Sequence, residues 1–136
     1  MWDNLVVKKV FDYFDLIRLN KPIGFLLLMW PCWFGLALLK IETSKLLFWY
    51  FLFFIGSFLM RSAGCIINDI IDIDFDQKVT RTKIRPLASK RISIAEAFLL
   101  LIVLLVISFF ILLEFNYKSI VLGLFSIPFV ILYPFM

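Results

Sequence analysis

The sequence has 136 residues, of which 63% are hydrophobic and only 18% are charged, and its mean hydropathy is +1.01. This composition excludes an ordinary soluble domain and indicates a membrane protein. The chain has no histidine, which excludes His-ligated zinc sites and His-dependent catalytic triads.

Four apolar stretches approach the length of about 20 residues that a transmembrane helix needs. They cover residues 22–39, 46–67, 95–113 and 119–136. The first stretch is too long, and too rich in Trp and Pro, for a signal peptide, so we expect it to be a retained helix. The expected fold is all-α, a polytopic transmembrane bundle with four spans in one membrane domain, residues 1–136.

The basic residues predict the orientation of these helices, because positive loops stay on the cytoplasmic side. They concentrate before the first span and in the connection of residues 69–94, whereas the opposite loops hold Lys40, Lys45 and Lys118. The net charge of +4 is thus explained by topology, and we expect no nucleic-acid partner. Both termini and the loop 69–94 are predicted to be cytoplasmic.

Acidic residues close to the N-terminus argue against an organellar transit peptide, which would be poor in them. These are Asp3, Asp12 and Asp15. The predicted location is therefore a bacterial inner membrane, with the lipid bilayer as the chain's surroundings.

Local signals refine the helix boundaries. Ser93 and Glu96 have the spacing of a capping box, which predicts the start of the third membrane helix. Pro31 and Pro128 lie inside apolar stretches, where proline is expected to kink a membrane helix rather than break it.

Charge gathers where the second apolar stretch ends. If that helix continues, each residue turns by about 100°, and most polar side chains here share a face with Cys65. Relative to Asn68 the angles are about 20° for Arg61, 40° for Asp72, 60° for Cys65, 80° for Asp76 and 100° for Asp69. Asp74 falls opposite, at about 240°.

Carboxylates at this spacing repel one another unless a cation lies between them. Asn68, Asp72 and Asp76 offer oxygen ligands only, which suits Mg2+. Because Mg2+ in proteins usually also binds substrate phosphates, a phosphate-bearing ligand is expected, neutralised by the basic run that follows. That run contains Lys78, Arg81, Lys83 and Arg85. The alternative is that the acids and bases only pair with each other in a cytoplasmic loop.

The pattern Asn68-Asp69-x-x-Asp72-x-x-x-Asp76 resembles the first aspartate-rich motif of the UbiA superfamily of intramembrane prenyltransferases. Further segments look like its 4-hydroxybenzoate polyprenyltransferase branch. They are RLNKPIG at 18–24, MRSAGCIIND at 60–69, the RTxxRPL pattern at 81–87 and LYPFM at 132–136.

The resemblance implies a bundle of nine transmembrane helices around a cavity, with two aspartate-rich motifs that bind Mg2+ and a polyprenyl diphosphate. It implies transfer of the polyprenyl group to 4-hydroxybenzoate, a step of ubiquinone biosynthesis. Asn68, Asp72 and Asp76 would be the catalytic metal ligands, with Asp69 in support. Arg81 and Arg85, and with them Lys78 and Lys83, would bind the diphosphate. Arg61 would bind the acceptor carboxylate or brace the aspartates.

The sequence up to Met136 holds no second aspartate-rich motif. One expectation is that the chain supplies the first half of an enzyme completed in a longer chain or by a separate C-terminal fragment. Another is a truncated, non-catalytic membrane remnant that serves only in helix packing. A third is a UbiA-type prenyltransferase with a different acceptor.

Overall fold

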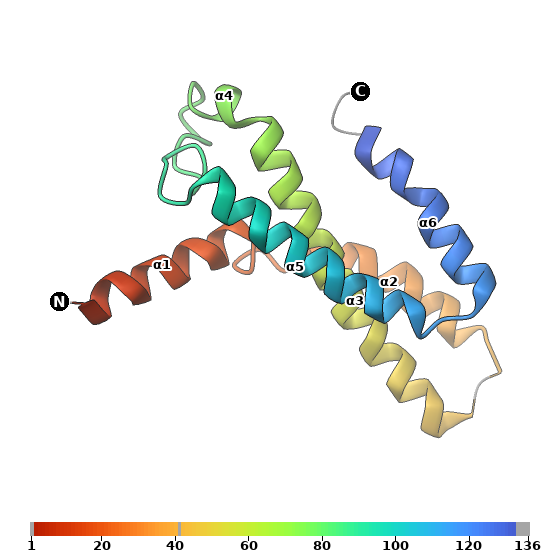
Figure 1. Ribbon diagram of the computed structural model, residues 1–136. Coiled ribbons are helices and arrows are strands. Elements are labelled where there is room, and N and C mark those ends of the chain that lie inside the picture. Colours follow the sequence, from red (N-terminus) through yellow and green to blue (C-terminus); the bar gives the residue numbers. More distant parts are fainter. Residues whose placement is uncertain (1, 41, 133–136) are drawn as a thin grey trace.

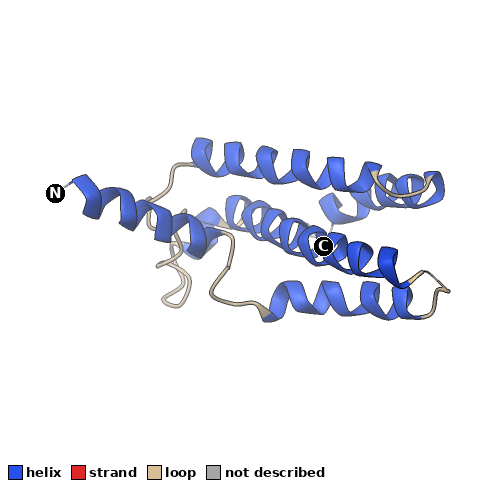
Figure 2. Cartoon of the chain, turned by 90° about the horizontal axis from the view of Figure 1, so that it is seen from below, coloured by secondary structure: helices blue, strands red, loops and turns tan. Residues whose placement is uncertain are grey.

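The computed structural model describes residues 2–40 and 42–132, and this part of the chain is all-helical, as expected (Figure 2). The helices are α1 (Trp2–Leu16), α2 (Ile23–Ala37), α3 (Thr43–Ile71), α4 (Ile73–Asp76), α5 (Ile94–Leu113) and α6 (Tyr117–Leu132). Residues 133–136, the end of the fourth predicted span, lie outside the described residues.

α3 is the central helix. It packs against α2 and against α5, and Figure 2 shows it lying between them. α6 contacts α5, and α1 touches α3 near the end that bears the aspartates. The N-terminal half of α1 stands clear of the other helices (Figure 1).

The length of α3 explains how one helix serves both the membrane and the charged site. Its 29 residues correspond to about 44 Å, more than the hydrocarbon core of about 30 Å. Its last turns can therefore carry Asn68 and Asp69 beyond the apolar layer.

Two helices, α3 and α5, are long and apolar enough to cross a membrane by length and composition. α2 and α6 are apolar but shorter, with 15 and 16 residues. Helices thus occupy all four predicted ranges, and the number of spans stays a prediction. α2 and α6 continue through Pro31 and Pro128, so these prolines do not break their helices.

The predicted capping box is present at the start of α5. The Glu96 backbone N–H donates to Ser93 Oγ at 3.2 Å, and the Ser93 backbone N–H donates to Glu96 Oε2 at 2.9 Å. This exchange satisfies two N–H groups that a helix start otherwise leaves without partners.

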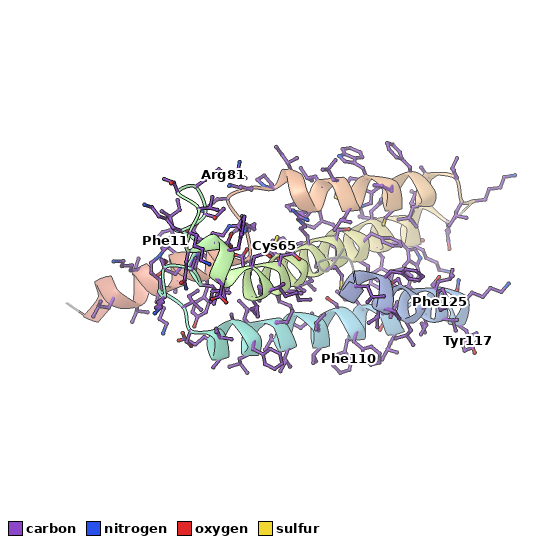
Figure 3. All side chains as sticks on the ribbon, turned by 90° about the horizontal axis from the view of Figure 1, so that it is seen from above. Phe11, Cys65, Arg81, Phe110, Tyr117 and Phe125 are labelled. Atoms are coloured by element: carbon purple, nitrogen blue, oxygen red, sulfur yellow. The ribbon has the colours of Figure 1, made fainter. Side chains whose placement is uncertain are left out.

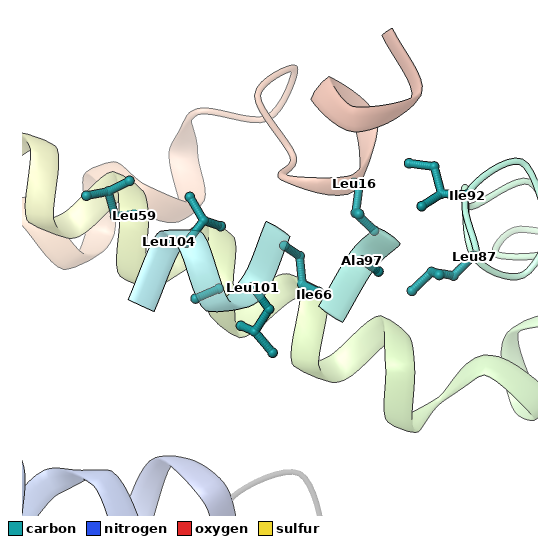
Figure 4. Close-up of a cluster of buried hydrophobic side chains, with 9 residues drawn as sticks. Leu16, Leu59, Ile66, Leu87, Ile92, Ala97, Leu101 and Leu104 are labelled. Atoms are coloured by element: carbon teal, nitrogen blue, oxygen red, sulfur yellow. The ribbon is translucent and has the colours of Figure 1, made fainter. Parts of the chain in front are cut away.

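The hydrophobic core lies where α1, α3, α5 and the loop before α5 meet (Figure 4). Its buried side chains are Leu16, Leu59, Ala63, Ile66, Leu87, Ile92, Ala97, Leu101 and Leu104. Leu87 and Ile92 come from the loop and are each 1% exposed. Because burying such side chains is favourable by about 1.5–3 kcal/mol each, the loop is a folded part of the bundle.

α1 is not among the elements that the sequence predicted. Its end follows a Schellman pattern, in which Arg18 N–H donates to Asp15 O at 3.2 Å and Leu19 N–H donates to Phe14 O at 3.0 Å. Arg18 accordingly has a φ of 59°, in the left-handed region that favours glycine.

Replacement of a core isoleucine tests this packing. Ile66→Ala should lower the free energy of unfolding in detergent by about 2–4 kcal/mol, because it leaves a cavity between α3, α5 and the loop. Ile102→Ala is the matched control, since Ile102 is 43% exposed and its loss should cost less than about 0.5 kcal/mol beyond helix propensity. Equal losses in the two variants would show that the core does not lie here.

Candidate functional site

Asp69 is the buried acid of the site. It is 1% exposed, and its Oδ1 accepts from Arg18 Nη2 at 2.7 Å and from Arg85 Nη1 at 3.2 Å. Two guanidinium groups offset the cost of burying this carboxylate. Asp69 therefore joins α3 to the segment after α1 and to the loop before α5.

The backbone places Arg18 for this contact. Its left-handed conformation ends α1 and turns the chain toward α2, at a cost of about 1 kcal/mol for a non-glycine residue. Ser62 Oγ on α3 donates to Ile17 O at 3.4 Å, which holds the same segment against α3.

Arg85 links two acids. Its Nη1 also donates to Asp76 Oδ2 at 2.6 Å, and Asp76 is 4% exposed. Thr82 Oγ1 donates to the Asp76 backbone carbonyl at 3.2 Å, so the loop closes over α4. Arg85 is thereby fixed between the end of α3 and the end of α4.

An open pocket of about 590 Å3 lies beside this cluster. Its charged lining consists of four cations, Arg18, Lys21, Arg61 and Arg85, and two acids, Asp69 and Asp72. Asn68, Asn20 and Cys65 also line it, and Figure 3 shows Cys65 on the side of α3 that faces α2. Arg18 and Arg85 pair with Asp69, whereas among the described residues Lys21, Arg61 and Asp72 form no ion pair. The pocket therefore offers positive charge from Lys21 and Arg61 beside the side-chain oxygens of Asn68 and Asp72, which suits an anion bound with a divalent cation.

A second pocket of about 540 Å3 shares Arg18, Lys21, Asp69 and Arg85 with the first. Arg81 and Arg91 add to its basic lining, and Arg81 lies on the loop at the outer end of the molecule (Figure 3). Lys78 and Lys83 are exposed and line neither pocket. Of the predicted diphosphate-binding residues, Arg85 and Arg81 are therefore the two that the structure brings to these pockets.

The helical face predicted for the aspartates is present except at its end. Arg61, Cys65, Asn68, Asp69 and Asp72 all line the first pocket. Asp76 does not, because α3 ends at Ile71 and Asp72 leaves helical geometry with φ −88° and ψ 6°. The shared face calculated for a continuing helix therefore does not extend to Asp76, which pairs with Arg85 instead. Asp74 is exposed and lies outside both pockets, as expected.

No group of three or more Asp, Glu or Cys side chains within residues 2–40 and 42–132 is arranged to hold a metal ion. Of the predicted metal ligands, Asn68 and Asp72 line the first pocket, together with the buried Asp69. The predicted three-residue metal set stays a prediction.

Arg61 and Gly24 form a close pair across the first pocket. A Cβ on Gly24 would lie 2.7 Å from Arg61 Nε, too close for any side chain to fit without moving Arg61. The absence of a side chain at position 24 therefore makes room for the guanidinium of Arg61, whose Cα lies about two helical turns before Asn68 on α3.

Sequence reasoning missed Arg18, Asn20 and Lys21 as lining residues. In the sequence, the segment RLNKPIG supports the family resemblance and its basic residues indicate topology, and neither property predicts a pocket lining. The sequence does contain a sign of this role. Arg18, Asn20 and Lys21 lie in a short polar segment directly before an apolar stretch that has no charged residue.

The comparisons with known proteins agree on one family. Residues 28–136 match the UbiA prenyltransferase family. The chain is 46% identical over 124 residues to the mitochondrial 4-hydroxybenzoate polyprenyltransferase of Caenorhabditis elegans, covering 90% of this chain and 35% of that relative. It is 43% identical over 125 residues to the 4-hydroxybenzoate octaprenyltransferase of Legionella pneumophila, covering 90% and 43%.

A third relative, the mitochondrial 4-hydroxybenzoate polyprenyltransferase of Dictyostelium discoideum, is 43% identical over 137 residues, which cover 99% of this chain and 30% of the relative. The chain thus spans less than half the length of these curated relatives. No solved structure matches the chain significantly.

Asp69→Asn tests the buried cluster. The substitution removes the charge that holds two arginines together, and it should lower the free energy of unfolding in detergent by about 1–3 kcal/mol. Asp74→Asn removes the same charge from an exposed position and should change stability by less than about 0.5 kcal/mol. If the two variants were equally stable, Asp69 would not carry the structural role given to it here.

Proposed function

The chain belongs to the UbiA prenyltransferase family, and we propose that it forms the donor-binding half of a prenyltransferase that moves a polyprenyl group from its diphosphate to 4-hydroxybenzoate. The remaining part of the site would come from a longer chain or from a separate C-terminal fragment. The names of the relatives support the donor and acceptor classes.

One observation carries the proposal. Asn68 and Asp72 line the same pocket as Arg18, Lys21, Arg61 and Arg85, at the end of the central helix α3. Oxygen ligands facing a cationic lining are what a magnesium diphosphate needs, because the metal and the basic side chains share its charge. If the acids and bases only paired with each other, Lys21, Arg61 and Asp72 would also be paired; among the described residues they form no ion pair, whereas Arg18 and Arg85 do.

The residues present fit Mg2+ in its usual protein setting. Mg2+ is generally held by one or two carboxylates, waters and substrate phosphates, and Asn68 and Asp72 supply one amide and one carboxylate to the pocket. Among the described residues, Asp69 Oδ2 is buried without a hydrogen-bond partner, which leaves a further acceptor beside them. Asp76 is the third proposed ligand, although its Oδ2 here accepts from Arg85. When bound, Mg2+ supplies positive charge that stabilises the departing diphosphate.

The chain's own residues hold the diphosphate and the ring. Arg85 and Arg81 would bind phosphate oxygens, with Lys78 and Lys83 adding positive charge at the loop surface. The bond between the allylic carbon and the diphosphate oxygen breaks, and the diphosphate keeps the electron pair. The allylic cation is then attacked by the ring carbon next to the one that bears the hydroxyl group. The ring then releases a proton. Exclusion of water by the apolar bundle protects the cation.

Arg61 is proposed to bind the acceptor carboxylate. It lines the pocket on the side of Gly24, away from the Arg85 pairs with Asp69 and Asp76. A bilayer location is part of the proposal, with a bacterial inner membrane as the specific membrane and the loop 69–94 and both termini in the cytoplasm.

A chimera tests the proposal. Residues 1–136 of this chain would replace the matching segment of the Legionella pneumophila octaprenyltransferase, and membranes would be assayed for Mg2+-dependent prenylation of 4-hydroxybenzoate. We expect activity, and we expect Asp72→Ala to lower it by at least about a hundredfold, the size of loss typical when a key electrostatic contribution is removed. Asp74→Ala should keep activity.

The controls separate the alternatives. A chimera that is inserted in the membrane and folded but inactive would favour the non-catalytic remnant. Activity on another aromatic acid but not on 4-hydroxybenzoate would favour a different acceptor, and equal activity in the Asp72 and Asp74 variants would contradict the proposed site.

Gly24→Ala tests the acceptor side in the same chimera. The new methyl group would displace Arg61, so we expect a several-fold higher KM for 4-hydroxybenzoate and little change in the KM for the donor. Gly35→Ala is the matched control in α2, because no atom lies within 4 Å of its added Cβ. A donor KM that rises as much as the acceptor KM would contradict the assignment of Arg61.

A further inference from the structure

α1 has two faces of opposite character. About 100° of rotation per residue places Val6, Val10 and Phe14 next to Val7 and Phe11 on an arc of about 140°. All five are exposed, at 62%, 42%, 38%, 52% and 61% respectively. We call these five side chains the outer apolar face of α1.

The opposite face of α1 is held by the loop and by α5. Asp12 is 6% exposed and pairs with Arg91 of the loop, and Lys9 pairs with Glu96 at the start of α5. Leu16 belongs to the hydrophobic core. Arg91 also donates to Ile84 O at 2.6 Å, so the ion pair with Asp12 joins α1 to the same loop that carries Arg85. These contacts turn the outer apolar face away from the bundle.

The position of α1 along the chain decides what can cover that face. Residues 17–22, six in number, separate it from the uncharged, apolar helix α2, and six residues reach at most about 20 Å. A helix so close to the membrane segment remains at the membrane surface. Lys8 borders the outer apolar face and Lys21 follows within the tether, and both are exposed, which adds attraction to anionic headgroups.

We propose that α1 lies in the lipid interface as an amphipathic anchor, with its outer apolar face buried in the boundary between headgroups and acyl chains. An interfacial helix of this kind combines an apolar face with a charged one. Through the pair of Asp12 with Arg91, and through the pair of Lys9 with Glu96 at the start of α5, it then holds the basic loop at the membrane surface, where a diphosphate with a membrane-embedded prenyl tail presents its charge. The anchor does not depend on the catalytic activity.

Spin-label accessibility tests the proposal on the whole chain in vesicles of phosphatidylcholine and phosphatidylglycerol. In a background of Cys32→Ala and Cys65→Ala, single labels are placed at Val10→Cys and Val6→Cys on the outer apolar face. Lys8→Cys is the matched control on the same helix. The measured quantity is the ratio of collision rates with oxygen, which enriches in lipid, and with a polar nickel complex, which stays in water.

We expect this ratio to be several-fold higher at positions 6 and 10 than at position 8. Equal ratios at the three positions would place the face in water and overturn the proposal. Low collision rates with both reagents at positions 6 and 10 would mean that protein covers the face, either another part of the protein or a second copy, and would also overturn it. Positions 6, 8 and 10 are exposed, so labels there do not enter the core. Cys65 is buried, so a far-UV circular dichroism spectrum of the Cys32→Ala and Cys65→Ala background, equal to that of the wild type, establishes that the fold is kept before labelling.

Discussion

The buried carboxylate of Asp69 is the constraint on which the site depends. It lies in the last turns of the central helix and accepts from arginines on both sides of it in the sequence, Arg18 and Arg85. A carboxylate that is 1% exposed requires such partners, because an unpaired buried charge is strongly unfavourable. Arg18 therefore ends α1 against α3, and Arg85 folds the loop back over α4. The two arginines are thereby placed on the lining of the pocket that Asn68 and Asp72 share.

Because α3 is long and ends just before Asp72, the aspartates of the motif have different positions and contacts. Asn68 and Asp72 face the pocket, Asp69 is buried behind them and Asp76 is paired with Arg85. Similar side chains thus have different surroundings, because the backbone leaves helical geometry at Asp72. The residues after Asp72 therefore do not continue the face of α3. The apolar core under the loop, with Leu87 and Ile92, keeps this arrangement together without ligand contacts.

Much of this arrangement follows from the sequence. The apolar stretches, the capping box at Ser93 and Glu96, and the shared face of Arg61, Asn68 and Asp72 depend on local periodicity and spacing, which a single sequence displays. The end of α3 at Ile71 and the pairing of Asp76 with Arg85 do not, because neither follows from the periodicity of the apolar residues. The role of Arg18 cannot be predicted from local spacing either, since its partner Asp69 is 51 residues away. α1 does not follow from the apolar stretches, because its 15 residues are interrupted by charged side chains, although its apolar residues repeat at helical spacing.

A double-mutant cycle of Arg18 and Asp69 tests the central claim, that this buried pair joins the N-terminal segment to the end of α3. The free energy of unfolding in detergent would be measured for the wild type, Arg18→Gln, Asp69→Asn and the double variant. The account predicts a coupling energy of about 1–3 kcal/mol, because the second substitution costs little once the first has removed the pair. Losses that add within about 0.3 kcal/mol would contradict it and would leave the two residues energetically independent.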